Sequence, residues 1–303
     1  MHKDPPNSLT SEEWLEVVHG AASVSTNETR VILFGGEPFL HKDRVFKICE
    51  RARSLGMQTS VITNASLLEE EDFFSLLERG PDIINLSIDT PLAELHDNIR
   101  GMPGAFAKTL QFLKKFKSFN HTQQSHRKIQ IDCIAVVSKS SLATLEEHIY
   151  FLRESGFDGV FFNVLSPTLK RKGASDPYFE KESKFYAQEL SSTFQKIKKL
   201  KRGMFNEFIR NSLSDLDLFA EYLENPTHDF SRAVCNSLQT VFVDPSGEVG
   251  FCNYTKDFIE PKGMGNVREK SIANIWQQPE SKNIQHKMQA CTKPCGAHGC
   301  HRI

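Results

Sequence analysis

The feature that most constrains the fold is a regular alternation of apolar runs and amphipathic stretches between residues 11 and 165. Short runs that stay apolar are typical of parallel strands, because such strands are covered on both faces. Strands that alternate with helices at this spacing form a parallel α/β architecture with right-handed crossovers. The sequence predicts five strands, at 31–34, 59–63, 83–88, 129–137 and 159–165, and intervening helices at about 43–55, 69–77, 105–119 and 142–152.

The first predicted helix comes before the first predicted strand. Thr10 to Glu13 have the pattern of a capping box, with Thr10 as the N-cap. Apolar residues then follow at helical spacing from Trp14 to Ala22. Because a strand precedes each helix in a β-then-α series, we expect one further strand upstream of Met1.

The first predicted strand ends in Gly35-Gly36-Glu37-Pro38. Glycines have no Cβ atom, so a ligand can approach the backbone closely there. Pro38 favours an extended conformation at Glu37. Bare backbone beside an acidic side chain suits a ligand that carries an ammonium group. The alternative is a plain β-to-α turn with a solvated glutamate, and four residues by themselves do not decide between the two.

The pattern changes after Pro167. Residues 168–230 are charged, and helical stretches are predicted near 180–194 and 204–223. The basic run at 196–202 is expected to be a solvated helix face rather than a surface for an anionic partner. Further on, 240–244 and 249–252 are predicted to form a β-hairpin around a Pro-Ser-Gly turn, and a short helix is expected at Ile272 to Trp276.

Five of the seven cysteines follow residue 234 and are candidate metal ligands: Cys235, Cys252, Cys291, Cys295 and Cys300. Closely spaced thiolates on a Gly/Pro-rich segment are typical of iron–sulfur sites. Zinc is the alternative, in a Cys₄ or a Cys₃His site with His298 or His301. Gaps of three and four residues between the last cysteines favour a cluster over zinc, which often uses a gap of two.

The other two cysteines, Cys49 and Cys133, lie on apolar faces of a predicted helix and a predicted strand. We expect both thiols to be buried and to bind no metal.

Charge and hydropathy exclude several classes of function. The 37 Lys and Arg residues nearly balance the 38 Asp and Glu residues, so nothing suggests broad attraction to nucleic acid or membranes. No apolar run approaches the ~20 residues of a membrane span, and the N-terminus has no signal-peptide pattern. We expect a cytoplasmic protein, in which clustered cysteines bind metal more often than they form disulfides.

Taken in order, the barrel-like motifs resemble those of the radical S-adenosylmethionine (SAM) superfamily. The strand end at 35–38 is similar to the family motif that binds the amino group of SAM. Ile62-Thr63-Asn64 is similar to the next strand end of that fold. The residues Ser87-Ile88-Asp89, followed by His96-Asp97 and Arg100-Gly101, are similar to the next segment of that fold.

The cysteine region resembles the SPASM/twitch extension of many of these enzymes. The similar features are Cys235, then Gly247 with Cys252, then the terminal group Cys291, Cys295 and Cys300. Gly265-Asn266-Val267 and Ile275-Trp276 fit the same pattern. The resemblance covers nearly the whole chain and is weakest over 168–230.

The resemblance implies a partial parallel (β/α) TIM-like barrel that lacks its first strand, followed by a small cysteine-rich β-hairpin domain. The implied domains are a partial radical SAM barrel at 1–167, a helical connection at 168–230 and a SPASM/twitch-like iron–sulfur domain at 231–303. The implied chemistry is reductive cleavage of SAM to a 5′-deoxyadenosyl radical, which abstracts a hydrogen atom from the substrate.

The resemblance also implies site residues and cofactors. Gly35, Gly36, Glu37 and Pro38 would hold the methionine amino group of SAM. Asn64, Ser87 and Asp89 would lie near cofactor or substrate, and Arg100 would meet a carboxylate. The five late cysteines would hold an auxiliary [4Fe–4S] cluster. Relatives modify peptides or proteins, among other substrates, and take electrons from a reductant such as flavodoxin or ferredoxin.

One departure from the family pattern changes the expected activity. The defining CX3CX2C motif, which holds the SAM-cleaving cluster, is absent from these 303 residues. The motif and the expected first strand belong to the same place, ahead of Met1, so we expect a late start or a truncation, or a paralogue that has lost the radical centre. As encoded, the chain is expected to be inactive. The alternative function is a non-catalytic partial-barrel binding protein with a structural cluster or zinc site.

Overall fold

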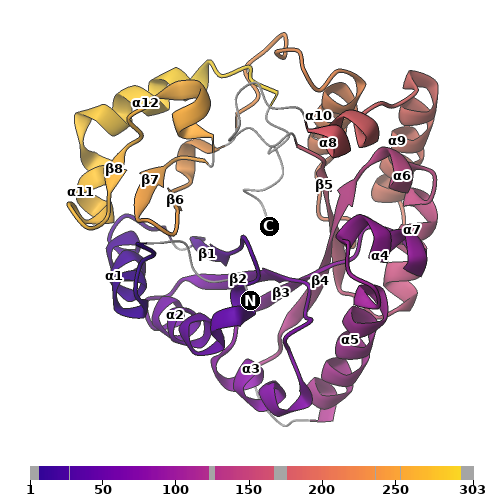
Figure 1. Ribbon diagram of the computed structural model, residues 1–303, viewed down its shortest axis with the longest axis horizontal. Helices are drawn as coiled ribbons and strands as arrows, with labels where there is room; N and C mark the ends of the chain where they lie inside the picture. Colours follow the sequence, from indigo (N-terminus) through magenta and orange to yellow (C-terminus); the bar gives the residue numbers. More distant parts are fainter. Residues whose placement is uncertain are drawn as a thin grey trace.

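The computed structural model of the chain describes residues 7–26, 28–122, 127–166, 176–235, 237–252 and 254–294. One sheet of parallel strands occupies its first half, in the order β1-β2-β3-β4-β5 (Figure 1). The strands are β1 (Arg30–Leu33), β2 (Gln58–Thr63), β3 (Ile83–Ser87), β4 (Gln130–Val137) and β5 (Gly159–Val164). The sheet curves into a half-barrel, so the prediction of an open, parallel barrel is confirmed.

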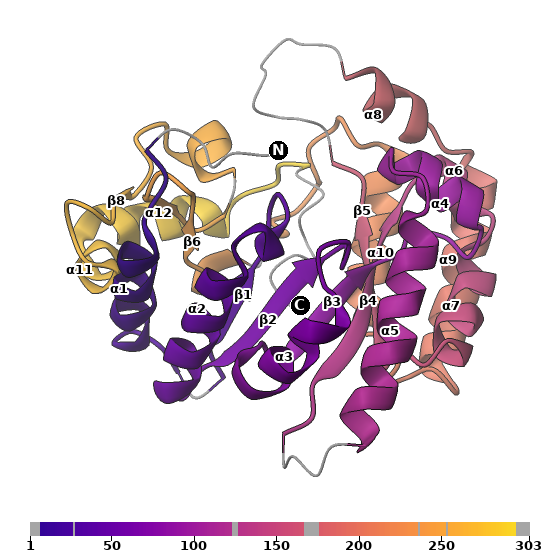
Figure 2. The same cartoon turned by 60° about the horizontal axis from the view of Figure 1, so that its bottom comes forward.

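Helices cover the outer face of this sheet (Figure 2). They are α1 (Ser11–Ala22), α2 (Lys42–Ser54), α3 (Phe73–Arg79), α4 (Ala93–Arg100), α5 (Ala105–Thr122), α6 (Lys139–Leu142) and α7 (Leu145–Glu154), with 3₁₀ turns at Pro38–His41 and Glu70–Asp72. The predicted capping box is present, since Glu13 N donates to Thr10 Oγ1 and Thr10 N donates to Glu13 Oε2. The α4 helix, the next element after β3, was not predicted from the sequence.

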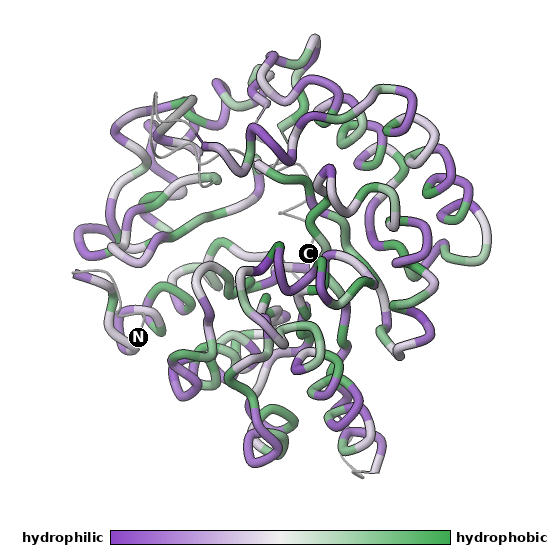
Figure 3. The backbone as a smooth tube through the Cα atoms, turned by 45° about the vertical axis from the view of Figure 1, so that its right-hand side comes forward, coloured by the Kyte–Doolittle hydropathy of each residue, from purple (hydrophilic) through white to green (hydrophobic). Residues whose placement is uncertain are grey.

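The core lies between the sheet and these helices. Val61, Ile84, Leu86, Ile131 and Val160 are all fully buried, which explains why their strands contain continuous apolar runs. Figure 3 shows hydrophobic segments along the strands and alternating hydrophobic and hydrophilic positions along the helices. The β1 strand differs, because each of its residues is only partly buried.

The two edges of the sheet are not alike. At β5 the returning chain continues the hydrogen-bonding pattern: Val160 N donates to Phe208 O at 2.7 Å and Arg210 N donates to Val160 O at 2.8 Å. The side-chain amide of Asn211 also accepts a hydrogen bond from Phe162 N and donates one to Phe162 O. At the opposite edge, no strand among the described residues pairs with the outer side of β1.

Helix boundaries in the connecting segment differ from those predicted. The structure has α8 (Pro177–Glu182), α9 (Ala187–Arg202) and α10 (Leu213–Glu224) in place of helices at 180–194 and 204–223. The basic run continues α9 because Leu190, Phe194 and Ile197 maintain its buried face. The α10 helix begins late because Ser212 is its N-cap and Asn211 is bound to β5.

The C-terminal part contains a small antiparallel sheet, in the order β6-β7-β8. Its strands are β6 (Phe242–Val243), β7 (Glu248–Gly250) and β8 (Gly265–Asn266), followed by α11 (Ile272–Gln277) and α12 (Pro279–Gln289). The predicted hairpin is confirmed, with Gly247 in the left-handed region at φ 89°. This unit lies beside α1 (Figure 1), where Arg268 Nε contacts Glu13 Oε1 at 2.6 Å. No helix in the described part of the chain is long and apolar enough to cross a membrane.

Candidate functional site

The carboxyl ends of β1, β2 and β3 lie at one edge of the half-barrel and carry the residues singled out in the sequence. At the end of β1, Gly35 and Gly36 have φ values of 88° and 54°, which glycine adopts more readily than other residues. A Cβ atom built on either glycine meets nothing within 4 Å. The backbone at this strand end is therefore open to a ligand.

Glu37 connects the ends of β1 and β2 through its carboxylate. Oε1 accepts from Thr63 Oγ1 at 2.6 Å and from Phe39 N at 3.2 Å, and Oε2 accepts from Asn64 N at 3.0 Å. Glu37 is extended, as predicted from Pro38, with φ −128° and ψ 108°. The side chain is thus hydrogen-bonded rather than freely solvated. A carboxylate has about four lone-pair positions, so one on Oε2 remains for a further donor.

The end of β2 contains a strained turn. Ala65 has φ 56° although it is not glycine, and it is 3% exposed. The turn is held because Ala65 N donates to Thr63 Oγ1 and because Thr109 Oγ1 donates to the Asn64 carbonyl. The Asn64 amide oxygen accepts from Ser66 N. Thr63 was quoted from the sequence only as part of the strand end at 62–64, and Thr109 was not identified, since a threonine in a strand or helix gives no signal of such a contact.

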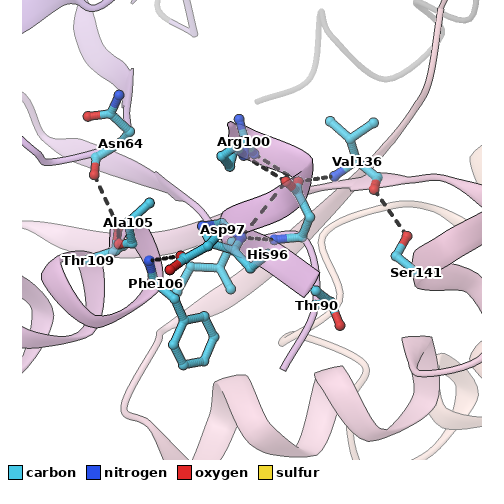
Figure 4. Close-up of polar contacts among 12 residues, drawn as sticks. Asn64, Thr90, His96, Asp97, Arg100, Ala105, Phe106, Thr109, Val136 and Ser141 are labelled. Atoms are coloured by element: carbon cyan, nitrogen blue, oxygen red, sulfur yellow. Dashed lines mark hydrogen bonds and ion pairs between the residues drawn. The ribbon is translucent and has the colours of Figure 1, made fainter. Parts of the chain in front are cut away.

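At the end of β3, Asp89 is 1% exposed and forms an ion pair with Arg100 of α4. Arg100 Nη2 donates to Asp89 Oδ1 at 2.8 Å, and Arg100 Nε lies 2.6 Å from Oδ2. Val136 N also donates to Oδ1 at 2.9 Å (Figure 4). The carboxylate that Arg100 meets in this structure is therefore that of Asp89. Ser87, the last residue of β3, is 7% exposed.

Asp97 connects α4 to α5. Its carboxylate accepts from Gly104 N at 2.5 Å and from Phe106 N at 2.9 Å, at the start of α5 (Figure 4). These backbone donors lower the pKa of Asp97. The residue fixes the orientation of the helix that carries Arg100.

Two buried histidines lie directly beneath this edge. His96 was quoted from the sequence only as part of a motif, with no role given to it, and His148 was predicted only as part of a helix. His96 of α4 is 1% exposed and His148 of α7 is fully buried. His148 Nε2 lies 3.0 Å from the Ile88 carbonyl, and Asp89 N donates to His96 Nδ1 at 3.2 Å. Burial lowers the pKa of His96. A histidine on an apolar helix face gives no sequence signal that separates such a contact from simple packing.

The buried imidazole of His148 predicts a pH-dependent loss of stability. Burial lowers its pKa to about 4, against the opposing effects of its Ile88 hydrogen bond and of Asp89. The unfolded chain therefore binds the proton first, and stability is retained above about pH 6.5 and lost as the pH falls towards 4. The loss is expected to be about 3 kcal/mol, because each pKa unit corresponds to about 1.4 kcal/mol. Urea unfolding at both pH values measures it.

A glutamine at position 148 keeps a donor for Ile88 but does not titrate. We expect the His148→Gln variant to lose less stability than the native chain over the same pH interval. The exposed His286 of α12 provides the control, since His286→Gln leaves the difference unchanged. Equal pH dependence in native and His148→Gln chains would contradict the assignment.

The C-terminal unit brings three of the predicted cysteine ligands towards one another. Cys235, Cys252 and Cys291 are partly buried free thiols. Val234 N donates to Cys291 O at 3.2 Å, so the segments that carry Cys235 and Cys291 lie side by side. Burial raises the pKa of Cys252, and the neighbouring Cys235 and Cys291 raise it further. Cys235 and Cys291 therefore lie close enough to Cys252 to affect its pKa.

The remaining predicted ligands, Cys295 and Cys300, and the alternative ligands His298 and His301 lie outside the described residues. Within the described ranges, no three His, Cys, Asp or Glu side chains are close enough together to hold one metal ion. The donor set nevertheless fits a cluster: three thiols from separate segments approach one another, and two more cysteines follow within ten residues of Cys291.

Cys49 and Cys133 are fully buried, as predicted. Burial raises the pKa of Cys49 to about 12 and that of Cys133 even further. Cys133 Sγ donates to the Ile88 carbonyl at 3.3 Å. Both thiols are packed in the core, and since metal ligation requires the thiolate, we still expect neither to bind a metal.

Replacing Cys49 or Cys133 by alanine is expected to leave bound iron unchanged. Each change removes a buried sulfur atom, so it costs stability of about 1–3 kcal/mol but no ligand. Iron per chain, measured by colorimetric assay after anaerobic reconstitution, checks the prediction. A loss of about four irons on either change would identify a cluster ligand.

Comparisons with known proteins agree with this arrangement. The family model of the radical SAM superfamily matches residues 2–126, and that of the SPASM iron–sulfur cluster-binding domain matches residues 235–301. These matches define the class of protein as a radical SAM barrel followed by an iron–sulfur cluster-binding domain. The half-barrel and the cysteine-rich unit of this chain fit that class. The chain belongs to the radical SAM superfamily and carries a C-terminal SPASM domain.

Two curated relatives come from Methanosarcina barkeri. The chain is 26% identical to an AdoMet-dependent heme synthase over 284 residues, covering 91% of this chain and 75% of the relative. It is 36% identical to an Fe-coproporphyrin III synthase over 283 residues, covering 89% of this chain and 66% of that protein.

Among solved structures, Streptococcus suis SuiB bound to the precursor peptide SuiA has the same fold. The TM-score is 0.67 at 17% identity, over 96% of this chain and 66% of SuiB. Another structure holds SuiB bound to S-adenosylmethionine, with a TM-score of 0.68 at 16% identity, over 96% and 67% of the two chains.

Proposed function

We propose that this chain forms the SAM-binding half-barrel and the auxiliary-cluster domain of a radical enzyme. The observation that carries the proposal is the open backbone at Gly35 and Gly36 beside a fixed Glu37 carboxylate, at the carboxyl edge of a parallel sheet. Ligands of parallel α/β folds bind at this edge. When bound and reduced by one electron, SAM supplies methionine and a 5′-deoxyadenosyl radical that takes a hydrogen atom from the substrate.

The residues of this chain would bind and orient SAM. The open backbone at 35–38 suits the methionine portion, and the remaining lone pair on Glu37 Oε2 suits its ammonium group. Asn64, Ser87 and Asp89 lie at the neighbouring strand ends and would line the same edge. Arg100 would keep the buried Asp89 charge paired while presenting its partly exposed guanidinium to the edge.

The five late cysteines would hold the auxiliary [4Fe–4S] cluster, with zinc as the alternative metal. Cys235, Cys252 and Cys291 supply three thiols from separate segments, which supports a shared centre. The proposed electron donor is a reductant such as flavodoxin or ferredoxin. A non-catalytic binding protein that retains the half-barrel and the metal site is the alternative function.

The substrate that we propose is a peptide or protein, on the basis of the fold shared with SuiB in its precursor-peptide complex. A tetrapyrrole is the second candidate. It is favoured by the names of the two Methanosarcina barkeri relatives, one of which is 36% identical over 89% of this chain.

Filling the open backbone with a methyl group tests the proposed SAM site. Gly35→Ala places a Cβ atom where SAM would approach, so SAM binding should weaken about tenfold or more, the effect of losing one good contact. Equilibrium dialysis with labelled SAM measures the dissociation constant.

Gly156 provides a matched control at the far end of the sheet. It has φ 94° and equally open surroundings, so Gly156→Ala causes the same backbone strain without touching the edge. We expect both variants to lose about 1 kcal/mol of stability. Only Gly35→Ala should lose SAM affinity. Equal affinities, or no SAM binding by the native chain, would overturn the proposal.

A further inference from the structure

The backbone directly after β3 leaves the sheet and needs new hydrogen-bond partners. Ile88 N still donates to Ile134 O of β4 at 3.3 Å. The next carbonyl and the next amide, Ile88 O and Asp89 N, are buried with residues that are 0% and 1% exposed. Buried backbone groups are almost always paired, so their partners determine where this strand end lies.

Side chains from two helices and one strand supply these partners. The Ile88 carbonyl accepts from His148 Nε2 at 3.0 Å and from Cys133 Sγ at 3.3 Å. The Asp89 amide donates to His96 Nδ1 at 3.2 Å (Figure 4). His96 comes from α4 and His148 from α7, so the two imidazoles hold the amide and the carbonyl of the single Ile88–Asp89 peptide group from different helices.

Each contact fixes the protonation state of its ring. An amide N–H is a donor, so His96 Nδ1 has to be the unprotonated nitrogen. A carbonyl oxygen is an acceptor, so His148 Nε2 has to carry the proton. The other nitrogen of the buried His148 ring, Nδ1, has no hydrogen-bond partner among the described residues. Both rings are therefore neutral Nε2–H tautomers in this arrangement.

An aromatic row joins the two histidines and keeps water away from them. The His96 ring lies 5.7 Å from that of Phe106, Phe106 lies 5.7 Å from Phe151, and Phe151 lies 6.1 Å from His148. The charged groups that face the pair are Asp89, Asp97 and Arg100 around His96, and Asp89 near His148. Burial outweighs the attraction of the two carboxylates and keeps both rings uncharged.

We propose that His96 and His148 are positioning residues that clamp the Ile88–Asp89 backbone and so set the placement of Ser87 and Asp89 at the SAM-binding edge. The inference rests on the proposed function only for what the edge binds. Asp89 supplies the amide of the clamped peptide group and Ser87 directly precedes Ile88, and Asp89 carries Arg100 through its ion pair. Loosening the clamp therefore moves three of the proposed site residues together.

Paired substitutions separate the hydrogen bonds from simple packing. His96→Asn keeps an acceptor at the Nδ1 position, whereas His96→Leu fills similar space without one. His148→Gln keeps the Nε2 donor, whereas His148→Met removes it. His286→Leu, on the exposed face of α12, is the remote histidine control. Amide hydrogen exchange at Asp89 and the dissociation constant for SAM are measured on each full-length variant.

The His96→Leu variant is expected to exchange the Asp89 amide about five- to tenfold faster and to bind SAM about five- to tenfold more weakly, the effect of one lost hydrogen bond. His148→Met is expected to weaken SAM binding by a similar factor. The Asn and Gln variants should stay close to the native chain, and His286→Leu should match it.

The ¹⁵N spectrum of histidine-labelled native protein adds a test that needs no variant. Both buried rings should carry their proton on Nε2. A proton on His96 Nδ1, or unchanged Asp89 exchange in His96→Leu, would overturn the clamp. Faster exchange with unchanged SAM binding would overturn its positioning role. Absence of SAM binding by the native chain would instead overturn the proposed function, while the exchange and tautomer measurements still decide the clamp.

Discussion

Anaerobic iron–sulfur reconstitution of the 303-residue chain is expected to yield no 5′-deoxyadenosine from SAM and dithionite. Reductive cleavage needs a cluster beside the bound SAM, held by three closely spaced cysteines. Ahead of Cys235 the sequence contains only Cys49 and Cys133, and both are fully buried with raised pKa values. Because both thiols are packed in the core, we expect neither to hold a cluster at the sheet edge. Chromatography of the quenched reaction should match a control without protein.

Adding a strand with a CX3CX2C loop ahead of residue 7 is expected to produce cleavage. The physical reason is the outer edge of β1, which has no strand partner among the described residues and so offers free backbone groups to a parallel neighbour. The same extension with its three cysteines changed to serine is the matched control. Production of 5′-deoxyadenosine by the unextended chain would contradict the prediction. No cleavage by the extended chain would favour the non-catalytic alternative.

The C-terminal cysteines are expected to bind a cluster in this chain without any extension. The segments that carry Cys235 and Cys291 pair directly, through Val234 N and Cys291 O, and Cys252 follows the β7 hairpin strand by two residues. Protein purified anaerobically should be brown and contain iron and sulfide in equal amounts, about four of each per chain. Cys252→Ala and Cys291→Ala should each lose most of that iron, because each removes one thiolate of the proposed set.

Cys49→Ala and Cys133→Ala are matched controls for these changes. They remove the same atoms from buried positions that have no part in the proposed set, so their iron content should stay native. Zinc in place of iron would support the structural-site alternative. Full iron content in both Cys252→Ala and Cys291→Ala would show that the ligands have been misassigned.

The two results together distinguish the functional alternatives. A cluster without SAM cleavage is expected of the 303-residue chain. A cluster with cleavage after extension supports the radical enzyme, and SAM binding that depends on Gly35 places the cofactor at the proposed edge. The clamp of His96 and His148 then bears on how firmly that edge holds its residues.

The sequence by itself determined the parallel half-barrel, because the strands of a sheet covered on both faces require continuous apolar runs at fixed spacing. All five predicted strands are present, each within one residue of its predicted bounds. The capping box at Thr10, the extended Glu37 before Pro38 and the hairpin turn at Gly247 also followed from local chemistry, since each depends on neighbours within a few residues.

Contacts between distant residues were decided only by the tertiary structure. Glu37 reaches Thr63 and Asn64 of the next strand end, and Asp89 is paired with Arg100 and with the backbone of β4. The late start of α10 depends on Asn211 bonding to β5. The two clamp histidines are 52 residues apart in sequence and lie on different helices, yet they bind the same peptide group, between Ile88 and Asp89. No local pattern encodes such a meeting, because it depends on how the sheet curves and where each helix packs against it.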